Sequence, residues 1–149
     1  MKVVKITDPL CVGRIIRDSR MSKRIQAKDL AEMAGTTAVT INNIEFGKHK
    51  PRLKTVMALL DVLGYEIAVR KKDGEKLHRP KAKNGIGDVL NLCRRRNDLS
   101  CRRLEFRTGV SRQTIMSIED MSRDPYLSTC ITLFNALGYE LLVVTKEVS

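Results

Sequence analysis

The sequence of 149 residues contains no tryptophan, and aromatic residues make up 4% of it. Hydrophobic residues still account for 42%, so a core has to be built from Leu, Ile, Val, Ala and Met, which suits small helical units. No apolar run approaches the roughly 20 residues of a membrane-spanning helix, and the N-terminus has no signal-peptide hydrophobic region. We therefore expect a soluble, cytoplasmic protein without a membrane partner.

Metal-binding and catalytic signatures are missing as well. The cysteines form no Cys-x-x-Cys pair, and both histidines lie far from any cysteine pair; these residues are Cys11, Cys93, Cys101, Cys130, His49 and His78. We expect no metal and no cofactor, and interpret the thiols as core residues, with a redox switch at Cys93 and Cys101 as the alternative. Because there is no glycine-rich phosphate loop, paired-carboxylate motif or nucleophile with a histidine partner, we expect no enzymatic activity.

Positive charge dominates the sequence, in which 28 Lys/Arg outnumber 17 Asp/Glu for a net charge of +11. This surplus favours a polyanionic partner, with nucleic acid ahead of an acidic membrane surface. A basic protein kept soluble by charge repulsion would have the same composition. The Lys/Arg and Asp/Glu counts are 13 and 7 in residues 1–70, 6 and 2 in residues 71–86, and 9 and 8 in residues 87–149.

The tetrapeptide LGYE occurs twice in the chain. An offset of 74 residues aligns Gly13–Val69 with Gly87–Val143 without a gap, and Arg20/Arg94, Gly35/Gly109 and Glu45/Glu119 are among the identical pairs. A self-match of this length predicts a duplicated structural unit, and two copies exclude a solenoid. Residues 71–86, KKDGEKLHRPKAKNGI, lack apolar periodicity and are interpreted as a flexible basic linker. The predicted domains are therefore 1–70 and 87–149, joined by the linker 71–86.

Within the first unit the pattern predicts four helices and a strand. The helices run from Pro9 to about Ser22, over Ala27–Ala34, from the capping residue Thr37 onward, and over Leu53–Leu63. After Gly64 the pattern alternates, which predicts strands over residues 65–69 and, in the second unit, 139–144. We expect these strands to pair with each other in a two-stranded ribbon, an internal pseudo-dimer. Pairing with another chain in a homodimer, or with an additional strand over residues 2–6, are the alternatives.

Two helices joined by a glycine turn, the second with a capped polar face, describe a helix-turn-helix. The stretch IQAKDLAEMAGTTAVTINNIEFGKHKPRLKTVMALLDVLG resembles the Cro-repressor or Xre-type helix-turn-helix, and LSCRRLEFRTGVSRQTIMSIED resembles a second copy. The resemblance implies a mainly α fold of two tandem lambda-repressor-like units, each followed by a short β-strand. It also implies that the second motif helix enters the DNA major groove. The added strand is similar to that of antitoxin-like members of this family, which dimerise partly through it and repress their own promoter.

The resemblance also implies which side chains meet DNA. Candidate groove-facing residues are Thr37, Ala38, Val39, Thr40 and Asn43 in the first unit, with Asn42 as an additional position, and Ser111, Arg112, Gln113, Thr114 and Ser117 in the second. Candidate phosphate contacts are Gln26, Lys28, Lys48, Lys50, Arg102, Arg103, Arg107 and Arg123. Asn43 and Gln113 suit adenine, Arg112 suits guanine, and the apolar Ala38 and Val39 suit a thymine methyl group. A solvated polar helix face is the alternative reading of all of them.

Two departures from the family pattern concern the first motif helix. A glutamine that many members place at its start is replaced by Ala27 and Cys101. Where the two motif helices touch, the first unit has the small Ala31, whereas the second has Glu105. Because an unpaired buried carboxylate is costly, this position predicts that the second motif is splayed or has lost its DNA role.

Together these patterns predict a cytoplasmic, nucleoid-associated regulator, by default a repressor, that binds double-stranded DNA sequence-specifically. The alternative is an antitoxin-type protein that binds a toxin partner and autoregulates its operon. The resemblance to strand-bearing members favours this alternative. Such antitoxins are commonly single-repeat chains, whereas this sequence has two repeats, which counts against the alternative.

Overall fold

The first half of the chain forms four helices in succession: α1 (Pro9–Ser22), α2 (Ala27–Ala34), α3 (Ala38–Phe46) and α4 (Leu53–Val62). Asp8 begins α1 by accepting a hydrogen bond from the Cys11 N–H at 2.9 Å, and Pro9 occupies the first helical position, where no N–H is needed. Gly35 ends α2 in the left-handed conformation, with φ of 73°. The predicted helices agree with these bounds to within one residue.

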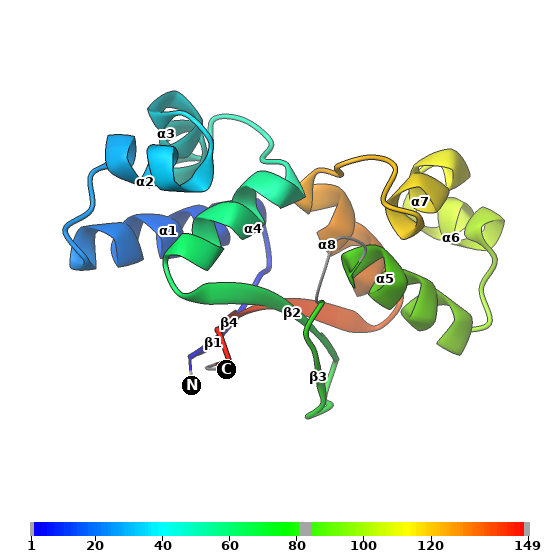
Figure 1. The fold of residues 1–149 in the computed structure, drawn as a ribbon. Helices are drawn as coiled ribbons and strands as arrows, with labels where there is room; N and C mark the ends of the chain where they lie inside the picture. The colour runs from blue at the N-terminus through cyan, green and yellow to red at the C-terminus, as the bar shows by residue number, and fades with distance from the viewer. Residues whose placement is uncertain (1, 81–84, 148–149) are drawn as a thin grey trace.

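The second half repeats this order with α5 (Gly85–Arg96), α6 (Cys101–Thr108), α7 (Arg112–Glu119) and α8 (Leu127–Ala136). Ser100 begins α6 by accepting a hydrogen bond from the Arg103 N–H at 3.1 Å. This computed structural model describes residues 2–80 and 85–147, and the eight helices and four strands lie within these ranges (Figure 1).

The strands form one antiparallel sheet in the order β1-β4-β2-β3, from β1 (Val3–Lys5), β2 (Tyr65–Lys71), β3 (Leu77–His78) and β4 (Tyr139–Thr145). The pairing of β2 with β4 inside one chain confirms the internal ribbon. A sheet of two strands was the wrong expectation, because β1 adds to β4 and β3 adds to β2. The additional strand near the N-terminus, weighed as an alternative partner, is thus present together with the internal pairing.

The predicted linker 71–86 is also partly wrong. Lys71 ends β2, residues 77–78 form β3, and α5 begins at Gly85. A two-residue strand with a single apolar side chain, Leu77, is too short to give a periodic signal. Residues 81–84 of the predicted linker lie outside the described residues.

The helices lie on one face of the sheet, with α4 and α8 nearest to its middle (Figure 1). One continuous hydrophobic core runs through both halves of the chain and includes Ile16, Leu30, Leu59, Ile67, Leu90, Phe134 and Val143. A second, small cluster of Ala68, Leu142 and Val144, with Leu77 packed against it, occupies the other face of the sheet. The two halves therefore share a core, which fixes them relative to each other.

Of the four cysteines, Cys93 and Cys130 are buried as expected, and Cys11 and Cys101 are half-buried. Burial raises the pKa of Cys93 to about 11 and that of Cys130 to about 12. A thiol with such a pKa stays protonated and unreactive at neutral pH, so Cys93 is poorly suited to the redox switch.

Candidate nucleic-acid interface

The first motif consists of α2, a turn at Gly35 and α3. The side chain of Thr37 accepts a hydrogen bond from the Thr40 N–H at 3.1 Å, as predicted for the capping residue, and the Thr36 N–H donates to the Ala31 carbonyl at 2.9 Å. Since the turn and the cap use backbone and hydroxyl groups of the motif itself, α3 starts at a fixed angle to α2.

The outer surface of α3 carries the residues that sequence reasoning singled out. Val39 is 68% exposed, Thr37 and Asn42 are exposed, and Ala38, Thr40 and Asn43 are half-buried, whereas Ile41 and Ile44 face the core. The helix lies on the side of the molecule remote from the sheet (Figure 1). Its outer surface is thus open to a large partner. Four exposed residues, Gln26, Lys28, Lys48 and Lys50, lie at the start of α2 or just beyond α3.

A buried ion pair fixes α3 to α1. Glu45, 4% exposed, accepts two hydrogen bonds from Arg20, Nε to Oε2 at 2.8 Å and Nη2 to Oε1 at 2.9 Å. The third guanidinium nitrogen, Nη1, donates to the Ile25 carbonyl at 3.0 Å, between α1 and α2. One side chain of α1 thereby contacts both α3 and the loop that leads into α2. Both residues are among the repeated identities of the sequence, and the recurrence of this charged pair at the same offset is the one signal there for their contact.

The second motif, α6–turn–α7, has the same local geometry. Gly109 has φ of 77°, and Ser111 caps α7 by accepting a hydrogen bond from the Thr114 N–H at 3.2 Å. On the outer surface of α7, Arg112 and Gln113 are exposed, while Ser111, Thr114 and Ser117 are half-buried. The remaining candidates of this half, Arg102, Arg103, Arg107 and Arg123, are all exposed.

Glu105 does not splay this motif. Its side chain is half-buried and accepts a hydrogen bond from the Arg112 N–H at 3.1 Å. A carboxylate at this place satisfies a free amide in the first turn of α7 and interacts favourably with the positive end of the helix dipole. The expectation of an unpaired carboxylate was wrong because its partner is a backbone group, which the sequence does not reveal.

Arg94 and Glu119 repeat the buried ion pair between α5 and α7, with Nε to Oε2 at 2.7 Å and Nη2 to Oε1 at 2.9 Å. Asn91 adds a further hydrogen bond to the Glu119 carboxylate. Burial raises the pKa of Glu119, but the hydrogen bonds from Arg94 and Asn91 outweigh it, so the pKa lies below its ordinary value. The carboxylate is therefore charged at neutral pH.

The two motifs are joined by a short bridge between the loops that precede α4 and α8. The Leu53 N–H donates to the Pro125 carbonyl at 2.8 Å, and the Leu127 N–H donates to the Pro51 carbonyl at 2.9 Å. The guanidinium of Arg52 stacks on the Tyr126 ring, 3.8 Å from its centroid. This second junction, added to the sheet, limits how far the motifs can move apart. No pattern in the sequence indicates this bridge, since it depends on two loops that are far apart in the chain but meet in the fold.

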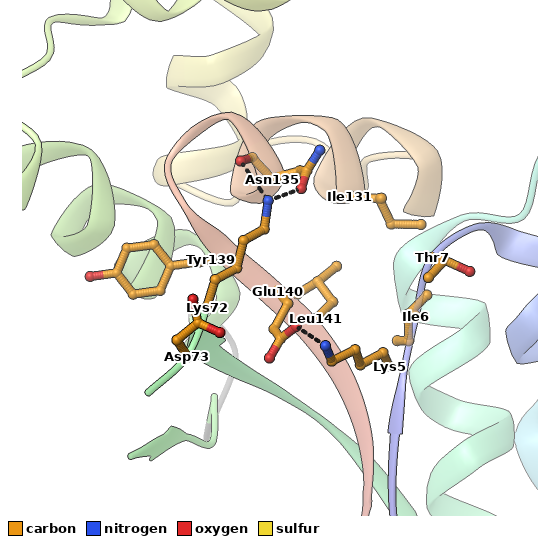
Figure 2. A pocket seen from close by; sticks show the side chains of 10 residues that line it. All are labelled: Lys5, Ile6, Thr7, Lys72, Asp73, Ile131, Asn135, Tyr139, Glu140 and Leu141. Atoms are coloured by element: carbon orange, nitrogen blue, oxygen red, sulfur yellow. Dashed lines mark hydrogen bonds and ion pairs between the residues drawn. The ribbon is translucent and has the colours of Figure 1, made fainter. Parts of the chain in front are cut away.

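A cavity of about 460 Å³ opens on the sheet side, between β1, β4 and α8 (Figure 2). Both lysines that line it are engaged: Lys5 pairs with Glu140 at 3.4 Å, and the Lys72 ammonium donates hydrogen bonds to the carbonyl and the side-chain oxygen of Asn135. Within residues 2–80 and 85–147 there is no group of three potential metal ligands. No helix in the same ranges is long and apolar enough to cross a membrane.

Comparison with known families agrees with this geometry for the first half of the chain. Residues 16–69 match the family model described as Helix-turn-helix, a range that covers the second half of α1, α2, the Gly35 turn, α3, α4 and most of β2. These residues form a helix-turn-helix domain of the Xre type. The chain matches none of the curated proteins and none of the solved structures with which it was compared.

Proposed function

We propose that the chain is a tandem of two helix-turn-helix units related by a pseudo-two-fold axis. The register of the central strands supports this. The ladder runs from Tyr65–Thr145 to Lys71–Tyr139, and moving each residue by 74 positions maps it onto itself, with Ala68–Leu142 at its centre. An antiparallel ladder with this property has a local two-fold axis through its central pair.

The edges of the sheet follow the same relation. In β1, Val3 pairs with Val144, and in β3, Leu77 pairs with Arg70. The 74-residue offset relates Val3 to Leu77 and Arg70 to Val144, so the two pairs are equivalent. A cation in β1 or directly after β3 also pairs with a glutamate of the adjoining central strand, Lys5 with Glu140 and Arg79 with Glu66. The second unit of the proposed tandem therefore starts near β3, within the predicted linker.

In this proposal α3 and α7 are the two recognition helices. Both lie on the side of the molecule away from the sheet (Figure 1), and the shared core and the loop bridge hold them at a fixed separation. They would enter successive major grooves on one face of a duplex, about 34 Å apart. Because the exposed residues of α3 and α7 differ, the preferred operator has two dissimilar half-sites.

Side-chain chemistry assigns the roles. Asn43 and Gln113 read adenine, Arg112 reads guanine, and Val39 with Ala38 packs on thymine methyl groups. The exposed candidates around the motifs contact phosphates: Gln26, Lys28, Lys48, Lys50, Arg102 and Arg123. Phosphate contacts position the protein and supply salt-dependent affinity, whereas the base contacts select the operator.

The proposed function is thus a sequence-specific DNA-binding regulator of transcription that represses by covering its operator. The observation that carries it is α3: a capped, outward-facing helix anchored by a buried ion pair, in a segment that matches the helix-turn-helix family.

Selection of binding sites from random duplex DNA, followed by titration at several salt concentrations, tests this function. We expect a defined operator, and an affinity that falls by about 10³-fold or more between 50 and 200 mM salt if at least six phosphates are contacted. Binding that is indifferent to both sequence and salt would contradict the proposal.

A further inference from the structure

Stripes of opposite charge occupy equivalent places on the first motif helices. On α2, Asp29, Glu32 and Met33 follow helical spacing, and Met33 is 56% exposed. On α6, the positions related by the 74-residue offset are Arg103, Phe106 and Arg107, and Phe106 is 91% exposed, the largest exposure among the large hydrophobic residues described. We call these the α2 stripe and the α6 stripe.

None of the charged groups in the two stripes is used inside the molecule. Asp29, Glu32, Arg103 and Arg107 take part in no ion pair or side-chain hydrogen bond found among residues 2–80 and 85–147. The phenyl ring of Phe106 lies beside a surface hollow that the α6 arginines line. Two carboxylates with an exposed methionine on one helix thus match two guanidiniums with an exposed phenyl ring on the other.

The neighbouring position on each helix behaves differently. Lys28 and Arg102 are equivalent, and both are basic and exposed, as expected for a contact with phosphate that the two units share. The stripe positions, in contrast, have opposite character in the two units. A role in DNA binding common to both units does not explain this divergence, whereas a contact between one stripe and the other does.

We propose that the α6 stripe of one molecule binds the α2 stripe of the next, so that copies assemble head to tail. α2 and α6 lie toward opposite ends of the molecule (Figure 1), so the stripes of a single chain do not meet. Pairing between two α6 stripes would bring four guanidiniums together and is disfavoured by repulsion. A contact between unlike surfaces is heterologous and propagates in one direction.

This inference rests on the proposed function, because binding to DNA is what places two copies side by side. With α3 and α7 in successive grooves, the long dimension of the molecule follows the duplex, and α2 and α6 lie at the two ends that are next to the adjacent sites. A contact made by three side chains from each molecule is weak in free solution, where the net charge of +11 also opposes association. DNA neutralises that charge and holds two copies at a high effective concentration, so the contact appears as cooperative binding.

The test compares a duplex of about 25 base pairs, long enough for one copy, with a duplex of about 75 base pairs that accepts several copies side by side. Binding per site is measured by fluorescence anisotropy on both. We expect the wild type to bind the long duplex about tenfold or more tightly per site than the short one. Equal affinity per site would overturn the inference but leave the proposed function intact. Failure to bind the short duplex would instead refute the proposed function.

Charge reversal separates the stripe contact from general electrostatics. Arg103→Glu/Arg107→Glu and Asp29→Arg/Glu32→Arg each give a molecule whose two stripes have the same charge, so each alone should lose cooperativity. An equimolar mixture of the two variants restores opposite charges at every junction and should regain it. A mixture that stays non-cooperative, with both variants folded by circular dichroism, would contradict the head-to-tail contact.

Two further variants complete the design. Phe106→Ala should lower the cooperativity about tenfold, since a central aromatic side chain commonly dominates such a contact. Arg123→Glu, the matched control, changes an exposed phosphate candidate of the same unit that does not line the hollow, and should weaken binding to both duplexes by the same factor. A loss of cooperativity in Arg123→Glu as large as in Arg103→Glu/Arg107→Glu would show that the stripe has no special role.

Discussion

Asn43 and Lys48 represent the two kinds of contact that the proposed interface makes with DNA. Asn43→Ala should weaken binding to the selected operator by about 1–3 kcal/mol and leave binding to random DNA nearly unchanged, because a lost adenine contact matters only at the correct base. Lys48→Ala should weaken both by similar factors and lower the salt slope by about one. Titrations on both DNAs distinguish these outcomes. Equal losses for Asn43→Ala would show that this residue does not read bases.

Glu119 gives the protein a predictable response to acid. Its folded-state pKa lies below the ordinary value of 4.5, so the carboxylate stabilises the fold above that pH, and this contribution is lost as the pH falls through the folded pKa. Glu119→Gln should therefore be less stable than the wild type at pH 7, and the difference should shrink steadily below about pH 4.5. Urea unfolding across this range measures it. A difference that stays constant with pH would contradict the assignment.

Residues that act on their immediate neighbours were predictable from the sequence, and those that act across the fold were not. Thr37 was predicted to cap a helix because a cap depends on residues three positions away. The Arg20–Glu45 pair joins positions 25 apart in the sequence, and no local pattern indicates that they meet. Glu105 was misjudged for the same reason, because its partner is the backbone of the next helix.

At the scale of elements, the approach of α1 to α3 depends on a missing side chain. A Cβ added at Gly13 would overlap the carbonyl oxygen of Ile44, a backbone atom that cannot move without shifting α3. Gly13→Ala should therefore destabilise the protein by about 2 kcal/mol or more, despite the higher helix propensity of alanine. Arg14→Ala, on the exposed side of the same helix, is the control and should change stability by less than about 0.5 kcal/mol. Urea unfolding of both variants checks the difference, and similar stabilities would refute the close contact.

The ion pair between α1 and α3 is tested by a double-mutant cycle. Glu45→Leu alone should cost about 3–5 kcal/mol, because it leaves the Arg20 guanidinium buried without its counter-charge, and Arg20→Met alone leaves the Glu45 carboxylate in the same position. Arg20→Met/Glu45→Leu removes both charges and should recover much of that loss. DNA binding by the double variant then distinguishes a role of the ion pair in the stability of the fold from a role in the orientation of α3. A double variant that folds well but binds DNA weakly would show that the pair orients α3. Additive costs of the two single changes would mean that the pair is not coupled.

The elements themselves were largely predictable. Helix ends marked by Pro9, Thr37 or Gly35 have a stereochemical reason that is visible in the sequence, and the change from helical to alternating pattern after Gly64 located β2. β3 escaped prediction because it gains its order from pairing with β2 and not from its own side chains. Edge strands of this length are defined by the sheet that they join.

At the scale of the whole molecule, the two halves behave as one body because they are joined at two levels along the same proposed axis. The β2–β4 ladder lies beneath the helices, and the bridge of Arg52 with Tyr126 lies between the motifs. Arg52 and Tyr126 differ by 74 positions in the sequence. The residue pairs of the β2–β4 ladder are exchanged with one another when each residue is replaced by the one 74 positions away. The sequence revealed the offset but not the axis, since an internal match leaves open whether two copies pair within a chain or between chains.

This arrangement predicts that the order of half-sites in the operator can be changed by design. Of the residues at the outer surface of α7 that correspond to those of α3, five differ, and Ser111→Thr, Arg112→Ala, Gln113→Val, Met116→Asn and Ser117→Asn together convert one surface into the other. The substituted positions are exposed or half-buried, so the fold should tolerate the change. Because the proposed axis relates the two helices, the variant should select an operator with two identical half-sites in inverted orientation, whereas the wild type should select dissimilar ones. Site selection from random DNA with both proteins decides the matter: an unchanged operator would mean that α7 does not read bases, and direct repeats would mean that the two helices are related by translation and not by a two-fold axis.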